Sequence, residues 1–287
     1  MTDYLDLSDK ITFLTVSLGT KWESYSQSLI KIYFPECSRI IVDGSQSWNP
    51  IYFTDYGDKV SSDYLILIDE DCFILSRNQL IFLIKLLDKD KNCALIATPD
   101  GGTYHRDYNP IACNTFFAII KRRALLKITN NIGWKSYKYS DVSNMADKKH
   151  VDFLDKSRVN YDKCEPYYPF FWALLKNNFT IKYLIPTLNR DLLASEIRIG
   201  KSNDPLLIHM WWLRSWHCRQ LDPYLKVANY DRYFSLEKKY LLSIFIKPSN
   251  RVIFLKKNLI RIINKVYFKF RSRVFRISRM FGFCMHR

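Results

Sequence analysis

The first 120 residues alternate short apolar runs with amphipathic segments. Strand-like segments occur at residues 11–17, 39–42, 64–68, 93–97 and 115–120, and the wholly apolar run 64–68 is typical of a strand buried on both faces. Residues 22–33 and 77–87 repeat apolar side chains at three- and four-residue steps, which predicts helices. Strands that alternate with helices build a mostly parallel sheet joined by right-handed crossovers. We therefore predict an α/β fold in which helices flank that sheet.

The second half of the chain is less regular. Residues 130–163 are polar with few long apolar runs, which predicts loops and short helices. A helix is expected at 168–177, a strand at 180–185 and a last short strand at 206–209. In parallel α/β sheets, ligands bind beyond the carboxyl ends of the strands. The residues that directly follow the strands are therefore the first candidates for chemistry.

Three consecutive carboxylates, Asp69, Glu70 and Asp71, directly follow the apolar run 64–68. A buried strand should not end in three negative charges unless something offsets them. Two carboxylates two positions apart can share a divalent cation, or one can bind the metal and the other a ribose hydroxyl. A solvated acidic turn is the alternative. Asp43 follows the run 39–42, so it should meet the acidic run at one edge of the sheet.

Four features, in this order, resemble the GT-A glycosyltransferases, most closely the family-2-like bacterial sugar transferases that invert. They are the strand and acid of 40–45, the strand and acidic run of 62–71, Glu165 ahead of a helix and a strand, and His209. Together they span roughly residues 10–212. The resemblance implies a GT-A (Rossmann-like) fold, a nucleotide-diphosphate sugar as donor, with UDP-sugar the first choice, and Mn²⁺ or Mg²⁺ as cofactor.

The resemblance also implies roles for the acidic run. Asp71 would be the main metal ligand, and Asp69 would bind the ribose or a metal-bound water, while Glu70 is expected to be structural. His209 would be a third ligand and would favour Mn²⁺ over Mg²⁺, because imidazole is softer than oxygen. Packing of His209 against Trp211 and the tryptophans after it is the alternative.

Three further residues have implied roles at the nucleotide. Asp43 would accept hydrogen bonds from the base or ribose, although it can also form a turn with Gly44. Thr15 and Ser17 would line the nucleotide pocket through backbone groups.

An inverting transfer needs a general base to deprotonate the acceptor hydroxyl, and Glu165 occupies the place of that acid, near a helix start. The family usually has an acidic pair there, whereas here Glu165 stands between Cys164 and Pro166. Asp162 is therefore the alternative base, and a helix-capping role is a third possibility. In a retaining enzyme neither carboxylate would act as the base.

The net charge of +16 is concentrated at the end of the chain. Residues 251–287 hold eleven Lys or Arg and no acid, with apolar residues at mixed three- and four-residue steps. This basic amphipathic pattern is typical of segments that bind anionic membrane surfaces. We predict a transferase domain over 1–245 and a membrane-associating tail over 246–287. The tail could instead pack on the domain; nucleic acid is not an expected partner, because no nucleic-acid-binding motif accompanies the charge.

These features predict an enzyme on the inner face of a bacterial cell membrane. Seven cysteines without C-x-x-C pairs, and an N-terminus unlike a signal peptide, indicate the cytosol. The expected acceptor is a lipid-linked or cell-surface saccharide in capsule, O-antigen or lipooligosaccharide synthesis. A nucleotidyltransferase is an alternative, although residues 17–21 make a poor phosphate-binding loop. A non-enzymatic basic protein that binds membranes or nucleic acid is another.

Overall fold

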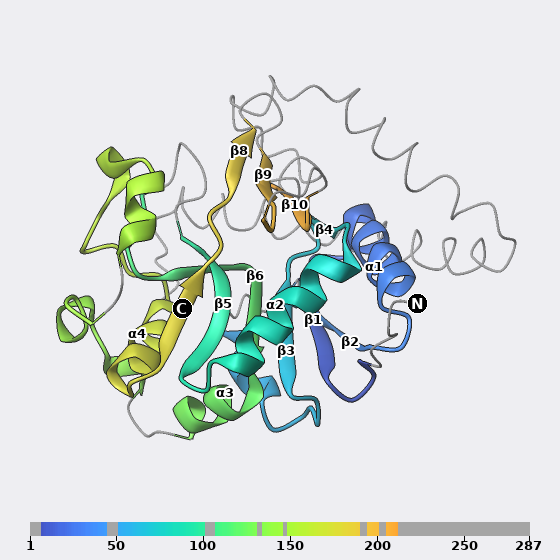
Figure 1. The fold of residues 1–287 in the computed structure, drawn as a ribbon, viewed down its shortest axis with the longest axis horizontal. Helices are drawn as coiled ribbons and strands as arrows, with labels where there is room; N and C mark the ends of the chain where they lie inside the picture. Colours follow the sequence, from blue (N-terminus) through green and yellow to red (C-terminus); the bar gives the residue numbers. More distant parts are fainter. Residues whose placement is uncertain are drawn as a thin grey trace, which may run out of the picture.

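The computed structural model describes residues 7–44, 51–100, 107–130, 134–145, 148–189, 194–200 and 205–211. Within these residues, six strands form a large sheet in the order β2-β1-β3-β6-β5-β7, and four strands form a smaller sheet in the order β4-β10-β9-β8 (Figure 1). The predicted boundary at residue 245 and the basic tail lie outside the described residues.

The large sheet is mostly parallel, as predicted. Its strands are β1 (Ile11–Ser17), β2 (Ser38–Asp43), β3 (Tyr64–Ile68), β5 (Cys93–Pro99), β6 (Cys113–Lys121) and β7 (Thr180–Tyr183). β1 pairs in parallel with β2 and β3, and β7 pairs in parallel with β5. β6 lies between β3 and β5 and is antiparallel to both. The carboxyl ends of β1, β2 and β3 therefore meet at one edge of the sheet.

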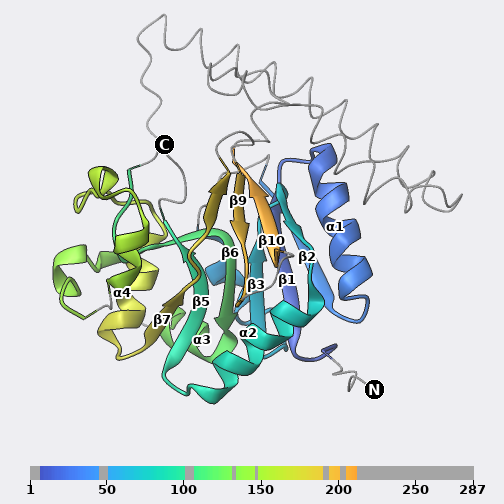
Figure 2. The same ribbon diagram turned by 45° about the horizontal axis from the view of Figure 1, so that its top comes forward.

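Two pairs of helices cover the two faces of this sheet (Figure 2). They are α1 (Lys21–Tyr33), α2 (Arg77–Lys89), α3 (Arg122–Thr129) and α4 (Tyr168–Lys176). α1 and α2 share one hydrophobic core with the β1 and β3 side chains that face them, including Phe13 and Ile66. α3 and α4 share another with the opposite side chains of the same strands, including Leu14 and Leu65. Successive strand residues thus feed opposite cores, which is why these strands are apolar throughout.

The predicted helices and strands of the large sheet form within a few residues of their predicted positions. α2 begins after Ser76, whose Oγ accepts a hydrogen bond from the Gln79 backbone N–H, as an N-cap residue should. α3 was not predicted. It starts directly after β6 with no turn residue between them, so the apolar pattern of the strand hides its beginning.

The small sheet stands beyond the carboxyl end of β3 (Figure 1). Its antiparallel strands are β4 (Cys72–Ile74), β8 (Thr187–Asn189), β9 (Ala194–Ile197) and β10 (Leu207–Met210). Only β10 was predicted. Because β4 begins directly after Asp71, its pairing with β10 carries the end of the described chain back to the acidic run.

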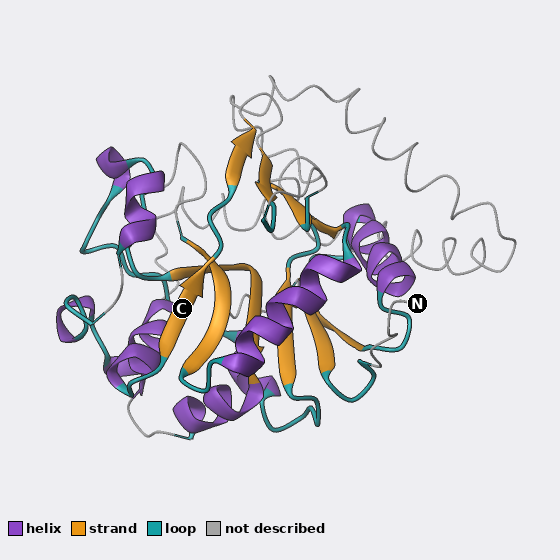
Figure 3. Cartoon of the chain, viewed as in Figure 1, coloured by secondary structure: helices purple, strands orange, loops and turns teal. Residues whose placement is uncertain are grey.

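Residues 134–145 and 148–163 contain short 3-10 segments joined by loops, as predicted (Figure 3). The 3-10 segments in the described residues are η1 (Tyr52–Tyr56), η2 (Trp134–Ser136), η3 (Tyr139–Asp141), η4 (Lys149–Phe153) and η5 (Lys156–Arg158). No helix in the described ranges has the length and apolar character needed to cross a bilayer.

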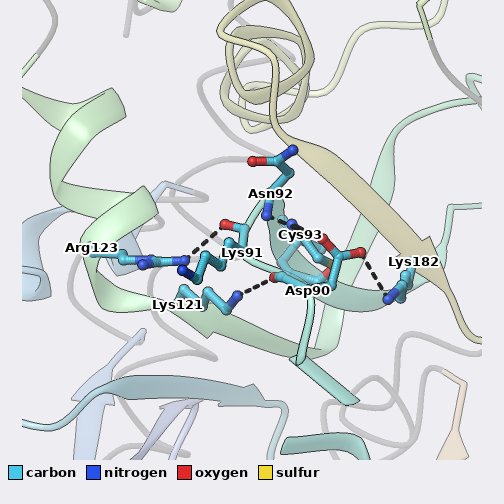
Figure 4. Close-up of polar contacts among 8 residues, drawn as sticks. Asp90, Lys91, Asn92, Cys93, Lys121, Arg123 and Lys182 are labelled. Atoms are coloured by element: carbon cyan, nitrogen blue, oxygen red, sulfur yellow. Dashed lines mark hydrogen bonds and ion pairs between the residues drawn. The ribbon is translucent and has the colours of Figure 1, made fainter. Parts of the chain in front are cut away.

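The turn before β5 is held by basic side chains from two other strands and α3 (Figure 4). Lys121 donates to the Asp90 carbonyl at 2.6 Å, and Lys182 pairs with the Asp90 carboxylate at 3.0 Å. Arg123 donates to the carbonyl of Lys91 at 2.8 Å. The hydrogen bond from Lys182 holds the pKa of Asp90 below its usual value, whereas burial lowers the pKa of Lys121. These contacts fix β5, β6 and β7 relative to one another.

Candidate active site

Backbone hydrogen bonds bring the acidic run against β10. The Cys72 N–H donates to the Asp69 carbonyl at 3.0 Å, which closes a tight turn between β3 and β4. The Met210 N–H donates to the Asp71 carbonyl at 3.0 Å, and His209 lies opposite Cys72 in the β4–β10 ladder. The pairing of β4 with β10 thus places His209 beside the carboxylates, although about 140 residues separate them in the sequence.

Asp69, Asp71 and His209 form a buried cluster with the donor set of a metal site. The three residues are 7%, 1% and 3% exposed, and one ligand atom from each lies within 4.8 Å of the others. His209 Nε2 is 3.5 Å from Asp71 Oδ1. Ligands about 2.1 Å from one Mg²⁺ lie at most about 4.2 Å apart, so the cluster needs only a small closure to bind such an ion.

The His209 imidazole supplies a second sign that the cluster suits a cation. Its buried Nδ1 has no hydrogen-bond partner in the part of the chain that the structure describes. Two carboxylates and an imidazole offer mixed oxygen and nitrogen donors, which suit Mn²⁺ or a similar transition ion better than Mg²⁺. The residues therefore fit the divalent cation that the sequence predicts.

His209 is also packed against aromatic rings, so ligation and packing are not exclusive. Its ring stacks on Phe116 with centroids 4.0 Å apart and meets Trp211 edge-on at 4.5 Å. Trp211 is held in turn, because its Nε1 donates to Ser195 Oγ at 2.7 Å. The ring is therefore held in one orientation beside Asp71.

Burial makes the negative charge of the cluster costly. Burial raises the pKa of the thiol of Cys72, the next residue, and the carboxylates of Asp69 and Asp71 raise it further. Two buried carboxylates held this close repel each other. A bound divalent cation would offset that repulsion.

Glu70, between the two aspartates, has a different environment. Its carboxylate is fully buried and accepts hydrogen bonds from the loop that joins β1 to α1. The donors are Leu18 N–H at 3.0 Å, Thr20 N–H at 3.3 Å and Thr20 Oγ1 at 2.7 Å. The Ser17 hydroxyl lies 3.1 Å from Glu70 Oε2 and 2.7 Å from Glu23 Oε2, which share its one hydrogen. This agrees with the structural role expected of Glu70.

The same hydrogen bonds bear on the nucleotidyltransferase alternative. A phosphate-binding loop after the first strand would offer its backbone N–H groups to a phosphate. In residues 17–20 the N–H groups of Leu18 and Thr20 donate instead to Glu70. The loop is therefore already filled by a carboxylate of the protein itself.

The predicted nucleotide-contacting residues lie at the same edge of the sheet. Ser17 and Asp43 are register partners at the ends of β1 and β2, and the Gly44 N–H donates to the Ser17 carbonyl at 2.8 Å. Asp43 is exposed. Thr15 is buried, and its Oγ1 accepts a hydrogen bond from Gln27 Nε2 at 2.9 Å. No ligand tests the roles assigned to these residues, so they stay predictions.

Glu165 lies three residues before the start of α4. Its side chain is 22% exposed and pairs with Lys163 at 2.8 Å, while its carbonyl accepts from the Tyr168 N–H. Asp162 is exposed, and its N–H donates to Asn160 Oδ1. Neither residue belongs to the Asp69–Asp71–His209 group. The choice between them stays a prediction.

The structure adds a buried polar group that the sequence did not predict. Asp100, at the end of β5, accepts hydrogen bonds from Asn114 and from the hydroxyl of Tyr168. Asp100 precedes two glycines, a pattern that fits either a plain turn or a close approach of the backbone to the donor sugar or diphosphate, and Asn114 gives no firm signal in the sequence. No local pattern joins residues that are 68 positions apart.

Comparisons with known proteins give structural likeness only. No protein-family model matches the chain, and no curated protein matches it. A glycosyltransferase involved in glycosylation of the major capsid of PBCV-1 is 12% identical, with a TM-score of 0.33, over 61% of this chain and 82% of that one. The mannosyltransferase PcManGT of Pyrobaculum calidifontis, in complex with GDP-Man and Mn²⁺, is 11% identical, with a TM-score of 0.32, over 57% and 68%.

The glycosyltransferase GlyE of Streptococcus pneumoniae is 14% identical to this chain, with a TM-score of 0.32, over 60% of this chain and 45% of that one. TM-scores this low do not establish an activity. The case for an activity therefore depends on the residues of the site.

Proposed function

We propose that this protein is a metal-dependent glycosyltransferase that transfers the sugar of a nucleotide-diphosphate sugar to a hydroxyl group of a saccharide. The observation that carries the proposal is the buried Asp69–Asp71–His209 cluster at the carboxyl end of β3. Ligands of α/β sheets bind at this edge, and Asp43 lies at the same edge. A donor diphosphate carries negative charge that such a site must balance.

Asp71, Asp69 and His209 would hold Mn²⁺ or Mg²⁺, and the bound ion would offset the charge of the diphosphate as it leaves. Asp43 would bind the base or ribose, with Thr15 and Ser17 beside it. Glu165, or Asp162 in its place, would accept the proton of the acceptor hydroxyl in an inverting transfer. A retaining transfer would use neither carboxylate for this step.

The acceptor and the location are further parts of the proposal. The eleven basic residues of 251–287, with no acid among them, support binding to an anionic membrane surface from the cytoplasmic side. A transferase held there would suit a lipid-linked saccharide, as in bacterial polysaccharide synthesis.

A screen of nucleotide-sugar hydrolysis tests the activity without knowledge of the acceptor. Purified protein is incubated with UDP-, GDP-, CDP- and dTDP-sugars and Mn²⁺ or Mg²⁺, and the released nucleotide is measured. We expect release from one donor class, its loss on addition of EDTA, and its loss in Asp71→Asn. Release that persists in both EDTA and Asp71→Asn would contradict the proposal, as would the absence of release and of nucleotide binding with every donor.

A further inference from the structure

Tyr168, the first residue of α4, joins the Glu165 turn to the core of the sheet. Its backbone N–H donates to the Glu165 carbonyl at 2.9 Å. Its buried hydroxyl donates to Asp100 Oδ2 at the end of β5. Through its backbone and its side chain, Tyr168 thus fixes the start of α4, and the turn that carries Glu165, to a strand of the large sheet.

A second set of contacts runs from Asp100 to the metal-binding cluster. Asn114 Nδ2 donates to Asp100 Oδ1 at 3.0 Å, and Asn114 Oδ1 accepts from the Phe116 N–H at 3.0 Å. The Phe116 carbonyl accepts from the Asp69 N–H at 3.0 Å, and its ring stacks on His209. A continuous series of contacts therefore connects the backbone carbonyl of Glu165 with the cluster.

Asp100 is the centre of this chain of contacts. It is fully buried, and a buried carboxylate is costly unless its oxygens accept hydrogen bonds. Each oxygen has its own donor, one from Asn114 and one from Tyr168. Hydrogen bonds to an ionised carboxylate are shorter than those between neutral groups and about twice as strong. The arrangement therefore favours a single position of α4 relative to β5 and β6.

We propose that Asp100, Asn114 and Tyr168 are positioning residues that hold Glu165 at a fixed distance from the Asp69–Asp71–His209 cluster. The inference rests on the proposed function, in which Glu165 is the general base. A base must lie within hydrogen-bond reach of the proton that it accepts. A displacement of about 1 Å can lower the rate by about 100-fold.

Tyr168→Phe tests the network, because it removes one hydroxyl and keeps the ring. Tyr64→Phe is the control, since Tyr64 is also buried and its hydroxyl also donates to a carboxylate, that of Asp88 on α2, although Asp88 is exposed whereas Asp100 is buried. We expect Tyr168→Phe to lower kcat by roughly 100-fold, with the donor KM and the Mn²⁺ affinity within about twofold of wild type. Tyr64→Phe should lose less thermal stability, because water can solvate the exposed Asp88 carboxylate, and should keep its kcat.

A double mutant separates positioning from general stability. If Tyr168 acts through Glu165, then Tyr168→Phe should lower the residual rate of Glu165→Gln less than about threefold, because the group it positions is already gone. A full 100-fold loss in that background would overturn the inference, as would wild-type kcat in Tyr168→Phe alone. A loss of Mn²⁺ affinity in Tyr168→Phe would overturn it too.

A spin label on Cys164 measures the turn without any reaction. Cys164 is exposed, whereas Cys37, Cys72, Cys93 and Cys113 are buried; Cys218 and Cys284 are changed to Ser in the full chain. We expect Tyr168→Phe to make the turn more mobile, which narrows the lines of the label's EPR spectrum. Tyr64→Phe should leave the spectrum unchanged.

An unchanged spectrum in Tyr168→Phe would overturn the positioning role. A sharpened spectrum in a protein that binds and hydrolyses no donor would instead defeat the proposed function, while the hold of Tyr168 on the turn would stand.

Discussion

Neighbouring carboxylates of the acidic run should respond in opposite ways to the same chemical change. Glu70→Gln and Asp71→Asn each replace a buried carboxylate by an amide of equal size. Glu70 accepts from the Leu18 N–H at Oε1, and from Thr20 Oγ1 and the Thr20 N–H at Oε2. In Glu70→Gln, an amide oxygen in this position would accept the same hydrogen bonds without the negative charge. An amide NH₂ group in this position would face the donors and could accept none of these hydrogen bonds.

The magnitudes follow from the contacts. An unsatisfied buried donor costs about 1–3 kcal/mol, so Glu70→Gln should lose roughly 3 kcal/mol of stability in total. In a domain of this size that lowers Tm by roughly 6–12 °C. Asp71→Asn removes one of two charges that repel each other, so its Tm without metal should equal or exceed that of wild type.

Ligand binding reverses the comparison. At 100 times its Kd, a ligand stabilises the folded state by about 2.7 kcal/mol, which raises Tm by roughly 5–11 °C. Glu70→Gln should keep this rise with Mn²⁺ and UDP. If Asp71→Asn weakens binding 100-fold, the gain falls to about 0.4 kcal/mol, or about 1 °C. Differential scanning fluorimetry with and without Mn²⁺ and UDP measures both effects. The reasoning is refuted if Asp71→Asn keeps the full rise, or if only Glu70→Gln loses it.

Two further predictions concern the third ligand and the tail. His209→Ala should weaken Mn²⁺ binding about tenfold or more, because it removes the nitrogen donor, and should change Mg²⁺ binding much less. Calorimetric titration with each ion measures both affinities. Equal losses of affinity for the two ions would contradict nitrogen ligation. Truncation after residue 247 should abolish binding to anionic liposomes, which in the full chain should weaken as salt rises. Flotation that is equal for both chains would remove the tail from the proposal.

The sequence predicts the part of the fold that has regular periodicity. β3 and the acidic run were predictable because a continuous apolar segment ends abruptly in charge. β4 was not predictable, because a strand of three residues shows too little alternation to identify. β8 and β9, with three and four residues, were not predicted for the same reason. The sheet that delivers His209 was therefore found only through its last strand.

The chemical environment of the site was less predictable than its residues. The order of the motifs placed Asp71 and His209 in one site, yet nothing local indicated that Phe116 would stack on the imidazole. The Tyr168–Asp100 hydrogen bond likewise joins distant segments through packing. Tyr168 lies in an almost wholly apolar helix, so its pattern predicted core burial and concealed its polar contact.

The acidic run is compatible with a buried strand end because its charges face different partners. Glu70 turns toward the β1–α1 loop, whose hydrogen-bond donors stabilise its charge within the protein. Asp69 and Asp71, two residues apart, gather with His209. Glu70 also fixes the loop from Ser17 to Thr20 beside the end of β2, where Asp43 lies. The structural carboxylate therefore sets the geometry between the proposed nucleotide-binding and metal-binding residues, which explains why a charge with no proposed chemistry stands between two that have one.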